Sequence, residues 1–350
     1  MRIAEGLTDL AEYRQDGERA DQVVRYDLSN NDMPFCPLPG VRCAIEEQIA
    51  GVFRYPDPGY RALRSALSRH CRVPVDGIAV GNGSVEVLRT IIRCVSNQGD
   101  RVVFAAPGFD AYARIVLASG AIPRMVAGGP GCWQPLEALL AAVDDDTSAI
   151  LVSLPHNPSG ETVAADEFVE FLRAVPDEVV VIVDQAYTEF SNAAGQFAVD
   201  ELIAQFPDLV VTRTFSKVYG LAALRVGYAV GTAAFMSRVR ACALPFAVNS
   251  LAASAAVESL CHPAELADRV RTVRTVRGRL RRVLGEAGYD GPPSQGNFVW
   301  VPTRETEKVV RMFRAGGIAV RDYPGVGVRV TATTEEALAA VSHALYLPAP

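Results

Sequence analysis

Residues that bind metals or form disulfides are scarce in this sequence of 350 residues. Its seven cysteines are scattered, odd in number and without a Cys-x-x-Cys pair, and its four histidines lack the spacing of metal ligands. These absences argue against a zinc site and against a disulfide framework. They favour reduced, mostly buried thiols in a cytoplasmic protein, and we expect no metal.

Long apolar runs and an excess of positive charge are also missing. No apolar stretch reaches the roughly 18–20 residues that a membrane-spanning helix needs, and the first 13 residues lack the apolar region of a secretory signal. The net charge of −6 gives no general attraction for nucleic acid or anionic membrane. We therefore expect neither partner, and an anionic ligand would have to be held by local positive groups.

The sequence does contain regular alternation of strand-like and helix-like segments. Short apolar runs, several rich in Val and Ile, predict buried strands at 77–80, 101–106, 122–127, 149–154, 179–184, 209–215 and 226–231. Segments such as Ser84–Ser96 and Asp166–Ala174 between them look helical. This alternation predicts an α/β fold with a doubly wound, mainly parallel, seven-stranded sheet. Ligands of such sheets bind beyond the carboxyl ends of the strands.

The pattern changes after about residue 232. A long helical segment, Pro263–Gly288, carries seven arginines that are not confined to one face, which favours a solvated, interdomain helix over a nucleic-acid surface. Strand-like pieces at 297–301, 318–321 and 327–331 then predict a smaller α+β lobe. We divide the chain into an N-terminal arm (1–38), a large cofactor-binding domain (39–249) and a small C-terminal domain (250–350).

A lysine follows the predicted strand at 209–215. Lys217 is flanked by Thr214 and Ser216, and Arg225 comes eight residues later. Lysine forms Schiff bases with carbonyl groups, whereas arginine and hydroxyl groups suit a phosphate. Pyridoxal phosphate (PLP) requires both kinds of group. Taken alone, the motif is equally compatible with a solvent-exposed lysine and a surface arginine.

An aspartate ends the predicted strand at 179–184. A buried carboxylate such as Asp184 is costly unless it meets a positive partner. The protonated pyridine nitrogen of PLP is such a partner, and its stabilisation lets the ring act as an electron sink. Tyr187 could hydrogen-bond the oxygen on the ring. The alternative is a helix N-cap aspartate followed by a core tyrosine.

Three further strands are followed by polar or aromatic residues. Asn157, at the tip of the rigid turn PHNPSG, could donate to the ring oxygen. GNGSVE (81–86) lacks the nicotinamide spacing GxGxxG, but its glycines let backbone N–H groups approach a phosphate at a helix N-terminus. Tyr112 could stack on the cofactor ring. Each of these has a simpler explanation, such as an ordinary Asn-Pro turn or a core aromatic. All five motifs nevertheless lie at the same edge of the sheet and together supply the groups that PLP needs, so they favour PLP.

With these motifs in place, the chain resembles the fold-type I PLP-dependent aminotransferases of the histidinol-phosphate aminotransferase group. The likeness rests on HNPSG (156–160), DQAY (184–187), TFSK (214–217) and GLAALRVGY (220–228), and it extends from 28 to 331. FSKVYGLAALRVGYAVG, PPSQGNFVW and GVRVT are most similar to the phenylalanine/aromatic branch.

The resemblance implies a role for each matching residue. Lys217, Asp184 and Tyr187 would be catalytic, with Lys217 bonded to the cofactor aldehyde and moving a proton between the substrate and the cofactor. Tyr55 would reach the phosphate of the neighbouring subunit, which implies a homodimer. The residues expected to bind the cofactor are Gly83, Ser84, Val85, Tyr112, Asn157, Asp184, Tyr187, Thr214, Ser216, Lys217, Arg225 and Tyr55. Those expected to bind the substrate are Tyr13, Asn30, Asn157, Arg321 and Arg329.

The implied reaction is a ping-pong transamination from an aromatic amino acid or histidinol phosphate to a 2-oxo acid such as 2-oxoglutarate. Three positions depart from the family pattern: Gln185 replaces the usual Glu, Val85 replaces a frequent Asp, and Asn30–Met33 replaces an NENP-type run. Another reaction of the same cofactor, by a decarboxylase, lyase or oxidase, stays open. A non-catalytic PLP-binding module is disfavoured by the intact Lys217 and the lack of a DNA-binding segment.

Overall fold

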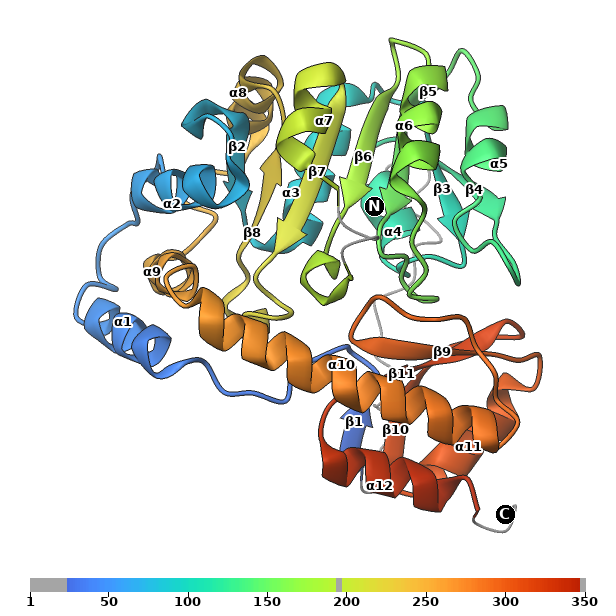
Figure 1. The fold of residues 1–350 in the computed structure, drawn as a ribbon. Coiled ribbons are helices and arrows are strands. Elements are labelled where there is room, and N and C mark those ends of the chain that lie inside the picture. The colour runs from blue at the N-terminus through green and yellow to red at the C-terminus, as the bar shows by residue number, and fades with distance from the viewer. Residues whose placement is uncertain (1–23, 193–196, 347–350) are drawn as a thin grey trace, which may run out of the picture.

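The computed structural model describes residues 24–192 and 197–346, which form a large and a small lobe (Figure 1). The large lobe contains a seven-stranded sheet of order β2-β8-β7-β6-β5-β3-β4, and the small lobe a four-stranded sheet of order β1-β10-β11-β9. Both sheets carry helices. The α/β fold with a seven-stranded sheet and a smaller α+β lobe is thereby confirmed.

The large sheet consists of the seven predicted strands, each within two residues of its predicted limits. Their bounds are β2 (Ile78–Gly81), β3 (Arg101–Ala106), β4 (Ile122–Ala127), β5 (Thr147–Ser153), β6 (Val180–Asp184), β7 (Leu209–Thr214) and β8 (Gly227–Val230). Strands β3 to β7 pair in parallel, and β8 runs antiparallel to both of its neighbours. Most are buried on both faces, which explains their continuous apolar sequences.

Helices cover both faces of this sheet. One face packs against α3 (Gly83–Val95), α4 (Tyr112–Ala118) and α8 (Ala233–Cys242). The other packs against α2 (Arg61–Cys71), α5 (Leu136–Ala141), α6 (Ala165–Ala174), α7 (Val199–Gln205) and α9 (Ser250–Ser259), with α1 (Pro39–Ile49) beside α9. Short 3₁₀ turns lie at η1 (Val75–Gly77), η2 (Thr188–Phe190) and η4 (Ala222–Leu224).

The small lobe is built on an antiparallel sheet to which the N-terminal segment adds a strand. Its elements are β9 (Phe298–Pro302), α11 (Thr306–Ala315), β10 (Ile318–Tyr323), β11 (Gly327–Thr331) and α12 (Glu335–Ala344). β1 (Tyr26–Leu28) pairs in parallel with β10. The described part of the arm therefore belongs to the small sheet, and its continuation leads into the large lobe.

Helix α10 (Pro263–Glu286) connects the two lobes (Figure 1). Three of its arginines are buried or half-buried, in contrast to the expectation of a solvated helix. Arg269 donates to the carbonyl of Cys36, Arg274 to that of Phe190 at 3.0 Å, and Arg277 to that of Gly296 at 2.7 Å. These guanidinium groups bind backbone oxygens of the arm and of both lobes, so they hold the lobes together.

The division into domains stays a proposal. Helix α9 belongs to the core of the large sheet through Ala252, Ala255 and Ala256, so we propose that the large domain extends beyond residue 249 into α10. Within residues 24–192 and 197–346, every helix is too short or too polar to cross a membrane.

Candidate active site

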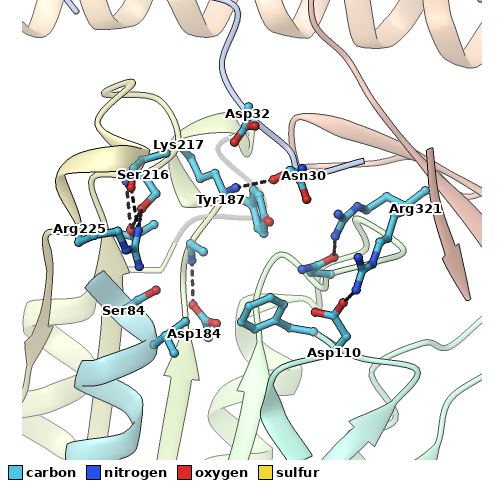
Figure 2. Close-up of a pocket in the computed structure, with 17 residues that line it drawn as sticks. Asn30, Asp32, Ser84, Asp110, Asp184, Tyr187, Ser216, Lys217, Arg225 and Arg321 are labelled. Carbon is cyan, nitrogen blue, oxygen red and sulfur yellow. Dashed lines mark hydrogen bonds and ion pairs between the residues drawn. The ribbon is translucent and has the colours of Figure 1, made fainter. Parts of the chain in front are cut away.

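A cavity of about 420 Å³ lies between the two lobes, at the carboxyl ends of the large sheet's strands. Most of the predicted site residues meet there. Its wall is formed by Asn30, Asp32, Ser84, Val85, Phe109, Asp110, Asn157, Asp184, Ala186, Tyr187, Thr214, Ser216, Lys217, Ala222, Arg225, Arg321 and Arg329. Figure 2 shows these side chains converging from the arm, the large sheet and the small sheet.

Lys217 follows the end of β7 and points into the cavity (Figure 2). Its Nζ donates to the backbone oxygens of Asn30 at 3.0 Å and Asn31 at 3.1 Å. Burial, with help from the positive charge of Arg329, lowers the pKa of Lys217 to about 8. A substantial share of the amine is therefore neutral in slightly alkaline solution, which makes it a nucleophile for an aldehyde and a base for a carbon acid.

Asp184 is the last residue of β6, and its side chain is almost fully buried. Its Oδ1 accepts from the backbone N–H of Ala186 at 3.1 Å, and its Oδ2 accepts from the hydroxyl of Tyr112 at 2.7 Å. Burial raises the pKa of Asp184 to about 6 in spite of these two bonds. A carboxylate placed this way gains from a cationic ligand, and the protonated ring nitrogen of PLP fits that need.

The two aromatic residues after β3 have different positions from those expected. Tyr112, predicted to stack on the cofactor ring, is buried behind the cavity, and its hydroxyl is bonded to Asp184. Phe109 lines the cavity instead, with its ring edge-on to that of Tyr112 at 5.4 Å and 88°. We propose that Phe109 supplies the stacking face and that Tyr112 supports Asp184. The sequence signal was the same APGFDAY segment, in which Phe109 lies nearer the strand.

Groups suited to a phosphate gather on one side of the cavity, where Figure 2 shows Ser84, Ser216 and Arg225 together. Ser84 lies in the first turn of α3, whose N-terminal N–H groups attract anions. The Arg225 guanidinium donates to Ser216 Oγ at 3.3 Å, and Thr214 donates to the same oxygen at 2.9 Å. Gly83 has φ +79°, a conformation that favours glycine, and a Cβ there would also displace Arg225, since it would lie 2.2 Å from Nη2.

Two donors remain for the oxygen on the cofactor ring. The hydroxyl of Tyr187 accepts from Asn31 Nδ2 at 2.8 Å, which leaves its own proton to donate. The side-chain oxygen of Asn157 accepts from Arg329, which leaves its NH₂ group to donate. Asn31 was missed from sequence. It is fully buried and has φ +56°, a left-handed conformation that asparagine tolerates.

The two predicted substrate arginines differ in their partners. Arg329 donates to Asn157 and to the backbone oxygen of Ser29, both neutral, and its Nε has no hydrogen-bond partner among the residues that the structure describes. Its charge is therefore available to a substrate carboxylate. Arg321 forms an ion pair with Asp110 (Figure 2).

One predicted residue, Tyr55, lies away from this cavity. Tyr55 is 82% exposed and contacts Phe246, with 4.8 Å between ring centroids, and it does not line its own chain's cavity. Tyr13 lies outside the described residues. The departure at Gln185 is part of the support behind the site, because its Oε1 accepts from Arg213 at 3.0 and 2.9 Å. In the described ranges, no group of three His, Cys, Asp or Glu residues could hold a metal.

Comparison with known proteins agrees with this geometry. The model of the family "Aminotransferase class I and II" matches residues 25–345. The chain is 40% identical over 305 residues to an aromatic amino acid aminotransferase of Rhodococcus opacus and 41% identical over 305 residues to one of Thermobifida fusca, covering in each case 87% of this chain and 85% of the relative. The crystal structure of histidinol-phosphate aminotransferase from Sinorhizobium meliloti in complex with pyridoxal-5'-phosphate superposes with a TM-score of 0.90 at 26% identity, covering 98% of this chain and 96% of the other.

Proposed function

Because the chain belongs to the aminotransferase class I and II family, we propose that this PLP-dependent aminotransferase moves the amino group of an aromatic amino acid to a 2-oxo acid such as 2-oxoglutarate. One observation carries the proposal. A lysine with a lowered pKa, a buried carboxylate and a cluster of phosphate-binding groups surround the same cavity, and Arg329 faces the same space.

The residues present fit PLP at each of its polar groups. Ser84, Ser216, Thr214 and Arg225 hold the phosphate, and Asp184 keeps the proton on the ring nitrogen. When bound, PLP withdraws electrons from the substrate Cα and so acidifies its proton. The neutral Lys217 amine would take the proton from the substrate Cα and return it to the former aldehyde carbon of the cofactor.

Arg329 fixes the orientation of the substrate. Its guanidinium can bind the α-carboxylate through two parallel hydrogen bonds, and its present partners, Asn157 and Ser29, keep the planar group in place. Holding the carboxylate at Arg329 would direct the Cα–H bond of the substrate, rather than its bond to the carboxylate, toward Lys217. This arrangement favours proton transfer over loss of carbon dioxide.

The proposed donor class follows from the relatives and from the arginines. The relatives at 40% and 41% identity are named for aromatic amino acids, whereas the structure named for histidinol phosphate shares 26%. A donor with a second acidic group, such as glutamate, would need a further cation in addition to Arg329. Because Arg321 is paired with Asp110, the cavity suits a donor with one carboxylate and a neutral ring.

We further propose that the enzyme is a cytoplasmic homodimer. Exposed apolar residues are concentrated around Tyr55, and a second copy of the chain would cover them. The patch consists of Ile49, Val52, Phe53, Tyr55, Leu244 and Phe246. Light scattering should give twice the mass of one chain, and a monomer would contradict this part of the proposal. All seven cysteines are free, in keeping with a reducing compartment, but the expectation that most are buried was wrong, because five are exposed and only Cys71 is fully buried.

The donor and the reaction can be tested together. Purified enzyme with PLP is mixed with Phe, Tyr, Trp, His, histidinol phosphate or Glu, and its visible band is followed before and after 2-oxoglutarate is added. We expect the aromatic donors to abolish the band and 2-oxoglutarate to restore it, while Lys217→Ala shows neither change. Turnover without a 2-oxo acid would indicate a different PLP reaction, and a response to histidinol phosphate alone would overturn the donor assignment.

A further inference from the structure

Two arginines of the small sheet face the cavity side by side. Arg321 of β10 and Arg329 of β11 are directly opposite each other in the antiparallel register, so their side chains leave the same face of the sheet. Both are buried and both line the cavity. Neighbouring like charges are unfavourable, and each arginine needs a compensating partner.

The partner of Arg321 carries a charge, whereas those of Arg329 are neutral. The ion pair joins Arg321 to Asp110, with side chains that are 10% and 26% exposed. Arg329 is bonded to an amide oxygen and a backbone oxygen. A substrate carboxylate therefore meets an uncompensated guanidinium at Arg329 and a compensated one at Arg321.

Asp110 lies where the side chain of a substrate would extend. It follows Phe109 in the turn between β3 and α4 and lines the cavity. Figure 2 shows Asp110 and Arg321 on the opposite side of the cavity from Ser84, Ser216 and Arg225. With the cofactor phosphate beside Ser84, Ser216 and Arg225, the Asp110–Arg321 pair borders the part of the cavity that is left for the substrate.

We propose that Asp110 determines substrate specificity by disfavouring a second anionic group. The inference rests on the proposed function, since it assigns a specificity to the same cavity. The carboxylate of Asp110 occupies Arg321 and also repels a distal carboxylate or phosphate, so both effects act in one direction. Substrates with a single carboxylate avoid this penalty, and a dicarboxylic 2-oxo acid must displace Asp110 from Arg321.

The proposal is tested with two unreactive acids that need no turnover. Maleate carries two carboxylates, and 3-phenylpropionate carries one carboxylate and an aromatic ring. Dissociation constants for both are measured on the PLP-loaded enzyme by calorimetry. We divide the dissociation constant of maleate by that of 3-phenylpropionate. In Asp110→Asn, we expect this ratio to fall about threefold to tenfold, because Arg321 is released from a partly buried ion pair and can bind the second carboxylate of maleate.

Matched variants separate charge from structure. Asp110→Glu keeps the charge and should keep the wild-type ratio, and Asp110→Ser should change it in the same direction as Asn. In an Arg321→Gln background, Asp110→Asn should have a smaller effect because Arg321 can no longer be released. Asp268→Asn, which breaks an exposed Asp–Arg pair on α10, controls for a general change in charge.

An unchanged ratio in both Asp110→Asn and Asp110→Ser, or a shift toward phenylpropionate, would overturn the proposal. The outcome is independent of the donor assignment. If wild-type enzyme failed to transaminate aromatic amino acids, the proposed function would fall, but the two dissociation constants would still report on Asp110.

Discussion

The hydrogen bond between Tyr112 and Asp184 offers a direct test of how the cofactor's ring nitrogen is held. The hydroxyl donates to Oδ2 at 2.7 Å inside the core, a short bond to a charged acceptor. Burial raises the pKa of Asp184 to about 6, and the Tyr112 bond opposes that rise. Tyr112→Phe removes the donor and keeps the ring in place.

The size of the effect follows from the strength of such bonds. A hydrogen bond to a charged group contributes about 1.5–3 kcal/mol, and about 1.4 kcal/mol corresponds to one pKa unit. The pKa of Asp184 in the PLP-free variant should therefore rise by about 1–2 units, from about 6 to about 7–8. As the pH is lowered, Asp184 of the variant becomes protonated at a higher pH than Asp184 of the wild type. The PLP affinity of the variant should therefore begin to fall at a higher pH. At pH 6.5, the dissociation constant should increase about threefold to twenty-fivefold.

The assay is a titration of the visible band with PLP from pH 5.5 to 8.5. Tyr289→Phe serves as the control, since the Tyr289 hydroxyl contacts Met312 Sδ at 3.9 Å and lies far from the cavity. If Tyr112 acted by stacking, phenylalanine would replace it without effect. A wild-type pH midpoint in Tyr112→Phe would thus refute the role of the Tyr112 hydroxyl in keeping Asp184 ionised.

Three more substitutions test the other side of the cavity. In the same titration, Phe109→Leu should raise the PLP dissociation constant about threefold to tenfold, which corresponds to the free energy of one aromatic contact. An unchanged constant would mean that another residue stacks on the cofactor ring. Arg329→Gln should raise KM about tenfold to a hundredfold for phenylalanine and glutamate alike in initial-rate assays, and an effect on glutamate alone would contradict its role. Lys217→Met should raise the Tm of the PLP-free protein by several degrees below pH 8. The pKa of Lys217 is about 8 in the folded protein and 10.5 in the unfolded chain, so the destabilising charge of the buried amine is lost as the pH rises from 8 to 10.5. The gain in Tm should shrink over the same range, and a constant gain would argue against a charged, desolvated amine.

The large sheet and the centre of the site could be predicted because the signals are local. A parallel strand buried on both faces is a continuous apolar run, and the polar residue that follows it marks the carboxyl edge. Asp184 and Lys217 were found by this rule, as were Asn157 and Ser84, and Arg225 was found by its place eight residues after Lys217. The fold then brings residues separated by more than a hundred positions into one cavity.

The parts that escaped prediction depend on distant pairings. Residues 26–28 look like part of a polar arm, and nothing nearby reveals that they pair with 318–320. Asn31 is bonded to Tyr187 and Thr331, 156 and 300 positions away. The choice between Phe109 and Tyr112 depended on which side of a single turn faces the cavity, which spacing within seven residues does not decide.

Asn31 shows why the small lobe and the cofactor site act as one unit. Its side chain is bonded to Tyr187 of the large lobe and to Thr331 of β11, and its carbonyl accepts from both Lys217 and Asn297. Lys217, Tyr187 and Thr331 are therefore all bonded to one residue of the arm. The strand β1, three residues earlier, pairs with β10, so the arm joins the lysine of the cavity to the small sheet that carries Arg321 and Arg329.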